Sequence, residues 1–287
     1  MAESKQTMSF EVFPPNTEIG TEKLFVTLDA LKALNPDFIS VTCSNNKADI
    51  EQTTIKVADY VQNQLKIPTT AHLPAAYLDK NQVTKILTQL REHEIHNILA
   101  LRGDILPEIE RKTDFMYASD LVKFIHEFDE NFVISGACYP EIHPESQNRV
   151  TDLSNLTRKV DAGVSNLITQ LFFDNESFYN FRENCAIAGI EVPILAGVMP
   201  IINRNQALRL FKTSQTKLPR KFVKILERYE NNPEALRDAG IAYAIDQIVD
   251  LLTEEAAGIH LYTMNNAKTA QAIHRATGSL FDFQKTE

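Results

Sequence analysis

The sequence predicts an α/β fold, a (β/α)8 TIM barrel with extra helices before its last strand, built as one catalytic domain over residues 1–287. Eight short β-favouring runs each precede a longer amphipathic stretch, which is the count of such a barrel. No linker, low-complexity tract or block of like charge divides the chain. A doubly wound sheet is the alternative. It usually carries a glycine-rich phosphate turn, but neither GxGxxG nor GxxxxGK[ST] occurs among the nine glycines.

The predicted strands are short runs rich in β-branched and aromatic residues. They cover 9–13, 38–43, 69–73, 97–104, 133–139, 166–173, 193–199 and 259–264. In the first, SFEVF, Glu11 stands among apolar residues and two prolines follow at once. Because proline ends a strand, we expect Glu11 at the carboxyl end of this strand. It is then either an acid tuned by the barrel interior or an edge residue that faces water.

The predicted helices follow the strands and show amphipathic spacing. They cover 21–34, 50–65, 81–94, 118–128, 150–163, 177–189, 204–214 and 267–278. The gap between the seventh and eighth strands is about twice as long as the others. Its extra residues, 219–256, predict additional helices with a turn at Asn231, Asn232 and Pro233.

Composition and charge exclude several functional classes. The net charge of −9 argues against sequence-independent binding to nucleic acid. No apolar run approaches the length of a membrane span, and the first residues have no signal-peptide core. The three cysteines, Cys43, Cys138 and Cys185, are scattered, which indicates reduced thiols in a cytoplasmic protein. Cys43 and Cys138 lie in predicted strands and are interpreted as small core residues.

Polar residues stand at nearly all of the predicted strand ends. Barrel enzymes place their chemistry at these ends, so the residues are expected to converge on one mouth. They are Glu11, Thr42, His72, Arg102, Gly103, Asp104, Tyr139, His143, Gln170 and Asn265. This pattern predicts an active site, and its spacing does not predict a metal site.

The helix after the fifth strand carries a second group of polar residues. Asp152, Asn155 and Lys159 are spaced i, i+3 and i+7, so they share a face, and Arg158 is beside them. This face would suit a nucleotide. The carboxylate could bind ribose hydroxyls, the cations could bind a phosphate, and the amide adds a further polar group. A solvated, salt-bridged helix face is the other interpretation.

With these residues in view, the chain resembles the methylenetetrahydrofolate reductase family over about residues 8 to 278. The motifs that carry the resemblance occur in order, about one in each barrel unit. They are SFEVFPP, FISVTC, the strand with His72, NILALRGD, MYASDLV, YPEIHPE, LTRKVDAG, ITQLFFD and HLYTMN. The family's fold is a (β/α)8 barrel, which agrees with the strand count reached independently.

The resemblance implies FAD-dependent reduction of 5,10-methylenetetrahydrofolate to 5-methyltetrahydrofolate, with NADH or NADPH as reductant. In this ping-pong reaction a hydride passes from the nicotinamide to FAD and then to the folate's one-carbon unit, and the product feeds methyl groups to methionine synthesis. The resemblance also implies a cytoplasmic homo-oligomer of bacterial type, a catalytic barrel without the long regulatory region of eukaryotic members.

The resemblance assigns roles to residues of this chain. Glu11 matches the general acid that protonates N10 of the folate, a task that burial near a second carboxylate would favour. Asp104 matches an aspartate near the flavin and the pterin, and Gln170 and Gln206 match substrate contacts. The residues that match FAD contacts are Thr42, His72, Arg102, Gly103, Asp104, Ala118, Tyr139, His143, Asp152, Asn155, Arg158 and Lys159.

Four positions depart from the family pattern. Cys43 replaces a frequent Tyr, Asn266 a frequent Arg, Leu210 an aromatic residue, and Val164 a frequent Ala that needs less space. Two other functions remain open at this point. One is a barrel flavoprotein reduced by a partner protein, and the other is a non-catalytic folate or flavin binder, which would be expected to have lost the acid at Glu11.

Overall fold

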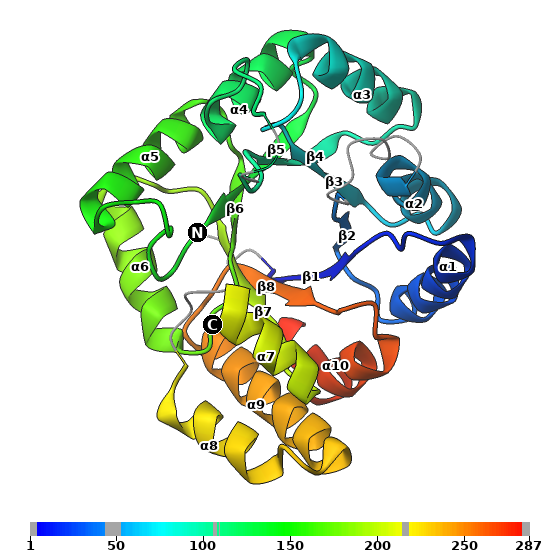
Figure 1. Ribbon diagram of the computed structural model, residues 1–287, viewed down its shortest axis with the longest axis vertical. Coiled ribbons are helices and arrows are strands. Elements are labelled where there is room, and N and C mark those ends of the chain that lie inside the picture. Colours follow the sequence, from blue (N-terminus) through cyan, green and yellow to red (C-terminus); the bar gives the residue numbers. More distant parts are fainter. Residues whose placement is uncertain (1–4, 44–52, 106–107, 109, 214–217, 283–287) are drawn as a thin grey trace.

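The computed structural model describes residues 5–43, 53–105, 108, 110–213 and 218–282, with only the backbone described for 209–213. Eight parallel strands close into a barrel in chain order, and helices surround it (Figure 1). The predicted (β/α)8 barrel is therefore confirmed. The strands are β1 (Thr7–Val12), β2 (Phe38–Val41), β3 (Thr69–Pro74), β4 (Asn97–Leu101), β5 (Val133–Cys138), β6 (Asn166–Thr169), β7 (Ile194–Val198) and β8 (Gly258–Tyr262).

The helices agree with the predicted order. They are α1 (Glu18–Lys32), α2 (Ile55–Asp59) with a following π-helical turn (Tyr60–Gln64), α3 (Lys80–Glu92), α4 (Ala118–Phe128), α5 (Arg149–Asp161), α6 (Asn175–Ile187), α7 (Arg204–Thr213), α8 (Arg220–Tyr229), α9 (Pro233–Thr253) and α10 (Ala267–Phe281). Residues 50–52 of the predicted second helix lie outside the described residues.

The extra helices before the last strand are also confirmed. They are α8 and α9, and the turn between them ends where predicted. Pro233 is the first residue of α9, where its missing N–H costs nothing. The side chain of Asn232 caps the helix by accepting a hydrogen bond from Ala235 N at 3.1 Å.

Seven of the eight strands end earlier than predicted, β1, β5 and β7 by one residue and β2, β4, β6 and β8 by two to four. β2 ends at Val41, β4 at Leu101 and β6 at Thr169, so the predicted ends at residues 43, 104 and 173 were wrong. In the loop after β4, Gly103 adopts φ +89°, which is outside the β region. Cys43 accordingly lies beyond β2 rather than in it, although it still packs against the core.

The barrel has an apolar exterior under the helices and a mixed interior. Along β1, Phe10 and Val12 are fully buried against the helical layer, while Ser9 and Glu11 alternate with them and face inward. Inside the barrel, Leu99, Ile168 and Leu195 form a small separate apolar cluster. The alternation therefore directs polar side chains of β1 into the barrel, where they can form a site.

The structure supplies the space that Val164 requires. Val164 is buried, and a Cβ added at Gly136 of β5 would lie 3.2 Å from Val164 Cγ1 and 3.1 Å from Lys159 Cδ. Glycine at this strand position therefore leaves room for the larger side chain.

In the described part of the chain, no helix is both long and apolar enough to cross a membrane.

Candidate active site

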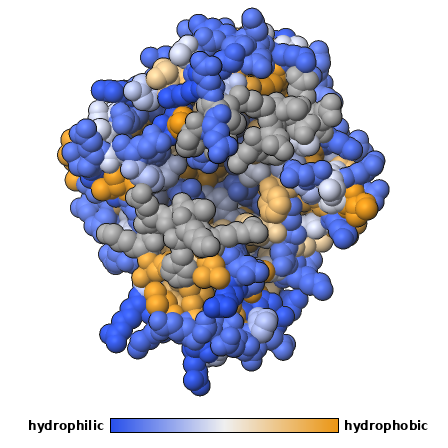
Figure 2. Space-filling view, in the orientation of Figure 1, coloured by the Kyte–Doolittle hydropathy of each residue, from blue (hydrophilic) through white to orange (hydrophobic). Residues whose placement is uncertain are grey.

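Glu11 lies at the carboxyl end of β1, and its side chain is 20% exposed. The space-filling view shows a hollow over the middle of the barrel (Figure 2). Glu11 Oε2 lies 3.6 Å from His72 Nε2 on β3 and 3.5 Å from His260 Nε2 on β8. The carboxylate thus lies between two histidines of the barrel interior. An edge residue that faces water would not have these neighbours, so that interpretation of Glu11 is wrong.

His260 is completely buried and joins Glu11 to two serines. Its Nδ1 lies 2.8 Å from Ser9 Oγ, and its Nε2 lies 3.2 Å from Ser40 Oγ. Because the Ser9 hydroxyl donates to Ile259 O at 3.2 Å, its oxygen accepts the Nδ1 proton. In the neutral ring, Nε2 is then an acceptor. His260 Nε2 can therefore receive a hydrogen bond from the Ser40 hydroxyl.

His72 is the second histidine beside Glu11, and it is 7% exposed. Burial lowers its pKa to about 4, against the opposing effect of the Glu11 charge, so the ring is neutral at pH 7. Its Nε2 is a buried atom with no hydrogen-bond partner. Such an unpaired atom is unfavourable, and it suits a site where a polar ligand group supplies the partner.

The β4–β5 side of the mouth carries the opposite type of chemistry. The Arg102 guanidinium donates two hydrogen bonds to the Glu145 carboxylate, at 2.5 and 2.6 Å. This bidentate pairing raises the pKa of Arg102 and lowers that of Glu145. Asp104 is exposed nearby and contributes to the electrostatics of Arg102. The structure therefore places Arg102 at the mouth, with its charge paired to a carboxylate.

Tyr139 and His143 lie next to this ion pair. Their rings make an edge contact with centroids 4.6 Å apart. Burial, with a smaller effect of Asp104, raises the pKa of Tyr139 to about 12. Burial lowers the pKa of His143, and its Nδ1 accepts a hydrogen bond from Glu145 N at 3.1 Å. These contacts join Tyr139 to His143, and His143 to Glu145, which is the partner of Arg102.

The polar face predicted on α5 separates into two groups. Asp152 accepts from Ser146 Oγ at 3.0 Å, and Lys159 Nζ donates to the β5 carbonyl of Ala137 at 2.6 Å. Burial lowers the pKa of Lys159. Asn155 and Arg158 are exposed. Asp152 and Lys159 therefore lie toward the barrel, and the interpretation of the whole face as solvated is wrong for these two residues.

Two of the predicted substrate contacts make local hydrogen bonds. Gln170 is exposed, and its Oε1 accepts from Leu171 N at 2.9 Å. Gln206 Oε1 accepts from Ile202 N at 3.1 Å, and its Nε2 donates to Pro200 O at 3.1 Å. The amide of Gln206 thereby closes the β7–α7 loop. Gln170 has the more accessible side chain, so it is the better placed of the two to meet a ligand.

The remaining predicted flavin residues have backbone roles that are visible in the structure. Thr42 directly follows the last residue of β2, and its backbone N–H donates a hydrogen bond to Val12 O at 2.9 Å. Gly103 passes close to Pro74, because a Cβ there would lie 3.0 Å from Pro74 Cβ. Ala118 is the first residue of α4 and is half-buried. These three residues shape the mouth by their backbone and small size.

The departures from the family pattern have local explanations at two positions. Asn266 is the N-cap of α10 and accepts from Thr269 N at 3.1 Å, a role in which asparagine is favoured. Cys43 is half-buried, and burial raises its pKa to about 11, so it is an unreactive thiol at neutral pH. The side chain of Leu210 lies outside the described residues.

Sequence reasoning missed several residues that the structure brings to the site. His260, Ser9 and Ser40 alternate with apolar residues in their strands, and this period-2 pattern was the available signal. Glu145 follows His143 in the loop, but nothing in the local sequence indicates its pairing with Arg102, a residue from another barrel unit.

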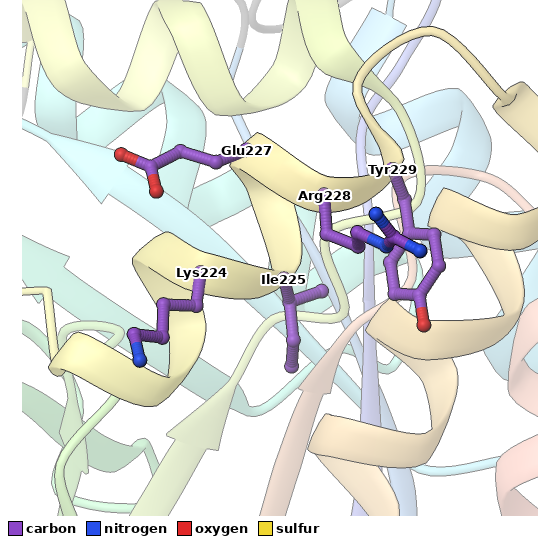
Figure 3. Close-up of a pocket in the computed structure, with 5 residues that line it drawn as sticks. All are labelled: Lys224, Ile225, Glu227, Arg228 and Tyr229. Carbon is purple, nitrogen blue, oxygen red and sulfur yellow. The ribbon is translucent and has the colours of Figure 1, made fainter.

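An open depression outside the barrel is a separate feature. It is lined by one helix, α8, through Lys224, Ile225, Glu227, Arg228 and Tyr229 (Figure 3). None of the predicted site residues lines it, so it is not the candidate active site.

Among the described residues, no group of His, Cys, Asp and Glu side chains could hold a metal ion.

Fold and site together define a (β/α)8-barrel enzyme with an acid inside its mouth and a paired cation at its rim. The sequence model of the family Methylenetetrahydrofolate reductase matches residues 1–278. The chain belongs to this family, which confirms the resemblance found in the sequence.

Two relatives illustrate the similarity. The chain is 35% identical over 271 residues to the 5,10-methylenetetrahydrofolate reductase of Pectobacterium carotovorum subsp. carotovorum, which covers 94% of this chain and 90% of that one. It is 35% identical over 291 residues to Methylenetetrahydrofolate reductase (NADH) 1 of Arabidopsis thaliana, covering 95% and 48%.

Among solved structures, an uncharacterized protein from Clostridium thermocellum that binds two copies of 5-methyl-5,6,7,8-tetrahydrofolic acid is similar, with a TM-score of 0.66. It covers 98% of this chain and 97% of its own, at 14% identity. At this identity the likeness shows the fold alone.

Proposed function

We propose that this protein reduces 5,10-methylenetetrahydrofolate to 5-methyltetrahydrofolate, using FAD and a nicotinamide. Membership of the family supports an oxidoreductase of folate one-carbon metabolism. The single observation that carries the proposal is the position of Glu11 inside the mouth, 3.5 Å from His260 Nε2 and 3.6 Å from His72 Nε2. An acid held beside two imidazoles in a mostly buried site is suited to giving a proton to a substrate.

The residues present fit a flavin dinucleotide. The buried Nε2 of His72 lacks a partner, and the cations Arg102 and Lys159 stand on the β4–β5 side for a diphosphate. Asp152 is available for ribose hydroxyls. The other residues that would hold the cofactor are Thr42, Gly103, Asp104, Ala118, Tyr139, His143, Asn155 and Arg158. When bound, FAD would carry a hydride from NADH or NADPH to the folate's one-carbon unit.

The chain's own residues then handle the proton and orient the substrate. Glu11 gives its proton to N10 of the folate, the bond between N10 and the one-carbon unit breaks with its electron pair on N10, and an iminium forms at N5. General acid catalysis of this kind contributes about 10²–10⁴-fold. Asp104 accepts hydrogen bonds from pterin N–H groups, and Gln170 and Gln206 contact the substrate.

Purified protein tests this proposal directly. We expect a yellow protein whose flavin absorbance is bleached anaerobically by NADH or NADPH alone and restored by methylenetetrahydrofolate, with methyltetrahydrofolate as product. Titration with each nicotinamide identifies the preferred reductant. A colourless protein that neither takes up added FAD nor acts on the folate would contradict the proposal.

Bleaching also separates the proposal from a related one, a barrel flavoprotein reduced by a partner protein. In that case the bound flavin would resist both nicotinamides and still be oxidised by the folate after chemical reduction. A homo-oligomer, expected from the resemblance, stays a prediction that sedimentation of the same sample would test.

A further inference from the structure

The turn after β8 has an unusual backbone. Met264 and Asn265 adopt φ values of 50° and 55°, the left-handed region that residues other than glycine rarely occupy. Two such residues in succession are unfavourable and persist only where the surroundings hold them. Strained residues of this kind cluster at functional sites, so the contacts of this turn are informative.

The turn is bonded to the end of β1 by two side chains. Asn265 Oδ1 accepts from Phe13 N at 3.0 Å, and its Nδ2 donates to Phe13 O at 2.8 Å. The Thr263 hydroxyl donates to Glu11 O at 2.7 Å, and Thr263 N donates to the same oxygen at 3.3 Å. Asn265 N donates back to Thr263 Oγ1 at 3.2 Å, which links the two contacts. We call Thr263 and Asn265, with these bonds, the clasp.

The clasp extends the pairing of β1 and β8 beyond the sheet. Regular register ends with Glu11 opposite Tyr262. Past that point, the amide of Asn265 takes both backbone groups of Phe13, as a neighbouring strand would. Phe13 is 40% exposed, so without the clasp its N–H and carbonyl would meet water. The clasp therefore fixes the backbone that directly follows the Glu11 Cα, from the Glu11 carbonyl to Phe13.

We propose that Asn265 and Thr263 are positioning residues for the proton transfer by Glu11, an inference that rests on the proposed function. An acid must lie within hydrogen-bond reach of the atom it protonates, and a displacement of about 1 Å can cost about 10²-fold in rate. The clasp holds the main chain of the acid, whereas His72 and His260 only neighbour its carboxyl. A clasp that merely closes the barrel would affect stability and leave the proton transfer unchanged.

A first test needs neither flavin nor folate. Amide hydrogen exchange of the segment containing Phe13 is compared in wild type, Asn265→Ala and Asn265→Gly. Because the Phe13 N–H loses its acceptor in both variants, we expect its exchange to be about tenfold faster or more in each. Unchanged exchange in both would overturn the clasp as a restraint on β1.

The second test measures the two half-reactions separately by stopped flow. We expect Asn265→Ala, Asn265→Gly and Thr263→Val to slow folate-dependent flavin oxidation about 10- to 100-fold, with flavin reduction by the nicotinamide within about twofold of wild type. Thr263→Ser keeps the hydroxyl and should restore the folate step. Asn265→Gly relieves the φ strain, so its loss of activity separates the side-chain bonds from backbone strain.

Asn266→Ala is the matched control. It removes the N-cap bond to Thr269 at the same strand–helix junction, but Asn266 has no side-chain bond to β1. In Asn266→Ala, the rates of flavin reduction and of folate-dependent flavin oxidation should keep the ratio that they have in wild type. Equal slowing of both half-reactions in the Asn265 variants, or full folate activity in them, would overturn the positioning role. A wild-type protein inert toward folate would instead overturn the proposed function, and the positioning role with it.

Discussion

The two sides of the barrel mouth are built differently. On the β8–β1 side, strand residues carry the site. His260 is completely buried, and the Glu11 backbone is held by Thr263. On the β4–β5 side, loop residues carry it, and Arg102 pairs with Glu145, whose side chain is 55% exposed. The first side holds a carboxyl in a mostly buried interior, and the second holds a charged pair at the edge of solvent.

Under the proposed function, this difference separates two tasks that would interfere at one place. A proton donor needs a low-dielectric setting that does not favour its charged form. Recognition of an anionic cofactor needs cations, whose field would keep a neighbouring carboxyl ionised. Placing the acid and the cations on different barrel strands satisfies both requirements.

The largest expected effect comes from the acid. Glu11→Gln keeps the shape of the side chain and removes the proton that it would donate, so folate-dependent flavin oxidation should fall by about 10²–10⁴-fold. Flavin binding and its reduction by NADH should stay close to wild type, because neither step needs the proton that Glu11 would give to the folate. Stopped-flow half-reactions measure both. Full folate activity in this variant would remove Glu11 from its role.

The next effect concerns stability and pH. Burial lowers the pKa of His72 from 6.5 to about 4. This shift corresponds to a cost of ~3 kcal/mol for protonating His72 in the folded protein rather than in the unfolded chain. Between these values the unfolded chain binds the proton and the folded chain does not, so stability falls as the pH falls from 6.5 toward 4. Urea unfolding at several pH values should show a shallower dependence in His72→Gln than in wild type.

His274→Gln serves as its control, because this histidine lies on the outer helix α10 and not inside the barrel. It should keep the wild-type pH dependence. If His72→Gln and His274→Gln gave the same curve as wild type, the buried neutral state of His72 would be contradicted.

The smallest effect concerns the β4–β5 side. In Glu145→Gln, the Arg102 guanidinium loses its bidentate carboxylate partner, whose 2.5 and 2.6 Å bonds neutralise it. We expect FAD to bind a few-fold more tightly, on the order of 1 kcal/mol because the pair is partly solvated. Fluorescence titration of the apoprotein at two salt concentrations measures this.

Glu130→Gln makes the same change in net charge in the turn before β5, at the opposite end of the barrel, and should leave FAD affinity unchanged. Weaker FAD binding in Glu145→Gln would mean that Glu145 orients Arg102 for the cofactor rather than competing with it.

The sequence by itself determined the barrel, the order of its elements and the position of Glu11. These features follow from local rules, because hydrophobic periodicity defines each element and two prolines end the strand after Glu11. The resemblance added the family, and the family match confirms it.

Only the tertiary structure decided which side chains meet. Glu145 reaches Arg102, Lys159 turns to Ala137 O, and the clasp joins residues 252 positions apart in the chain. The end of β4 was also placed too late, since Gly103 leaves the strand conformation at φ +89°. These features depend on how the closed barrel brings distant strands side by side. The local sequence pattern around a residue does not indicate which distant residue it will contact.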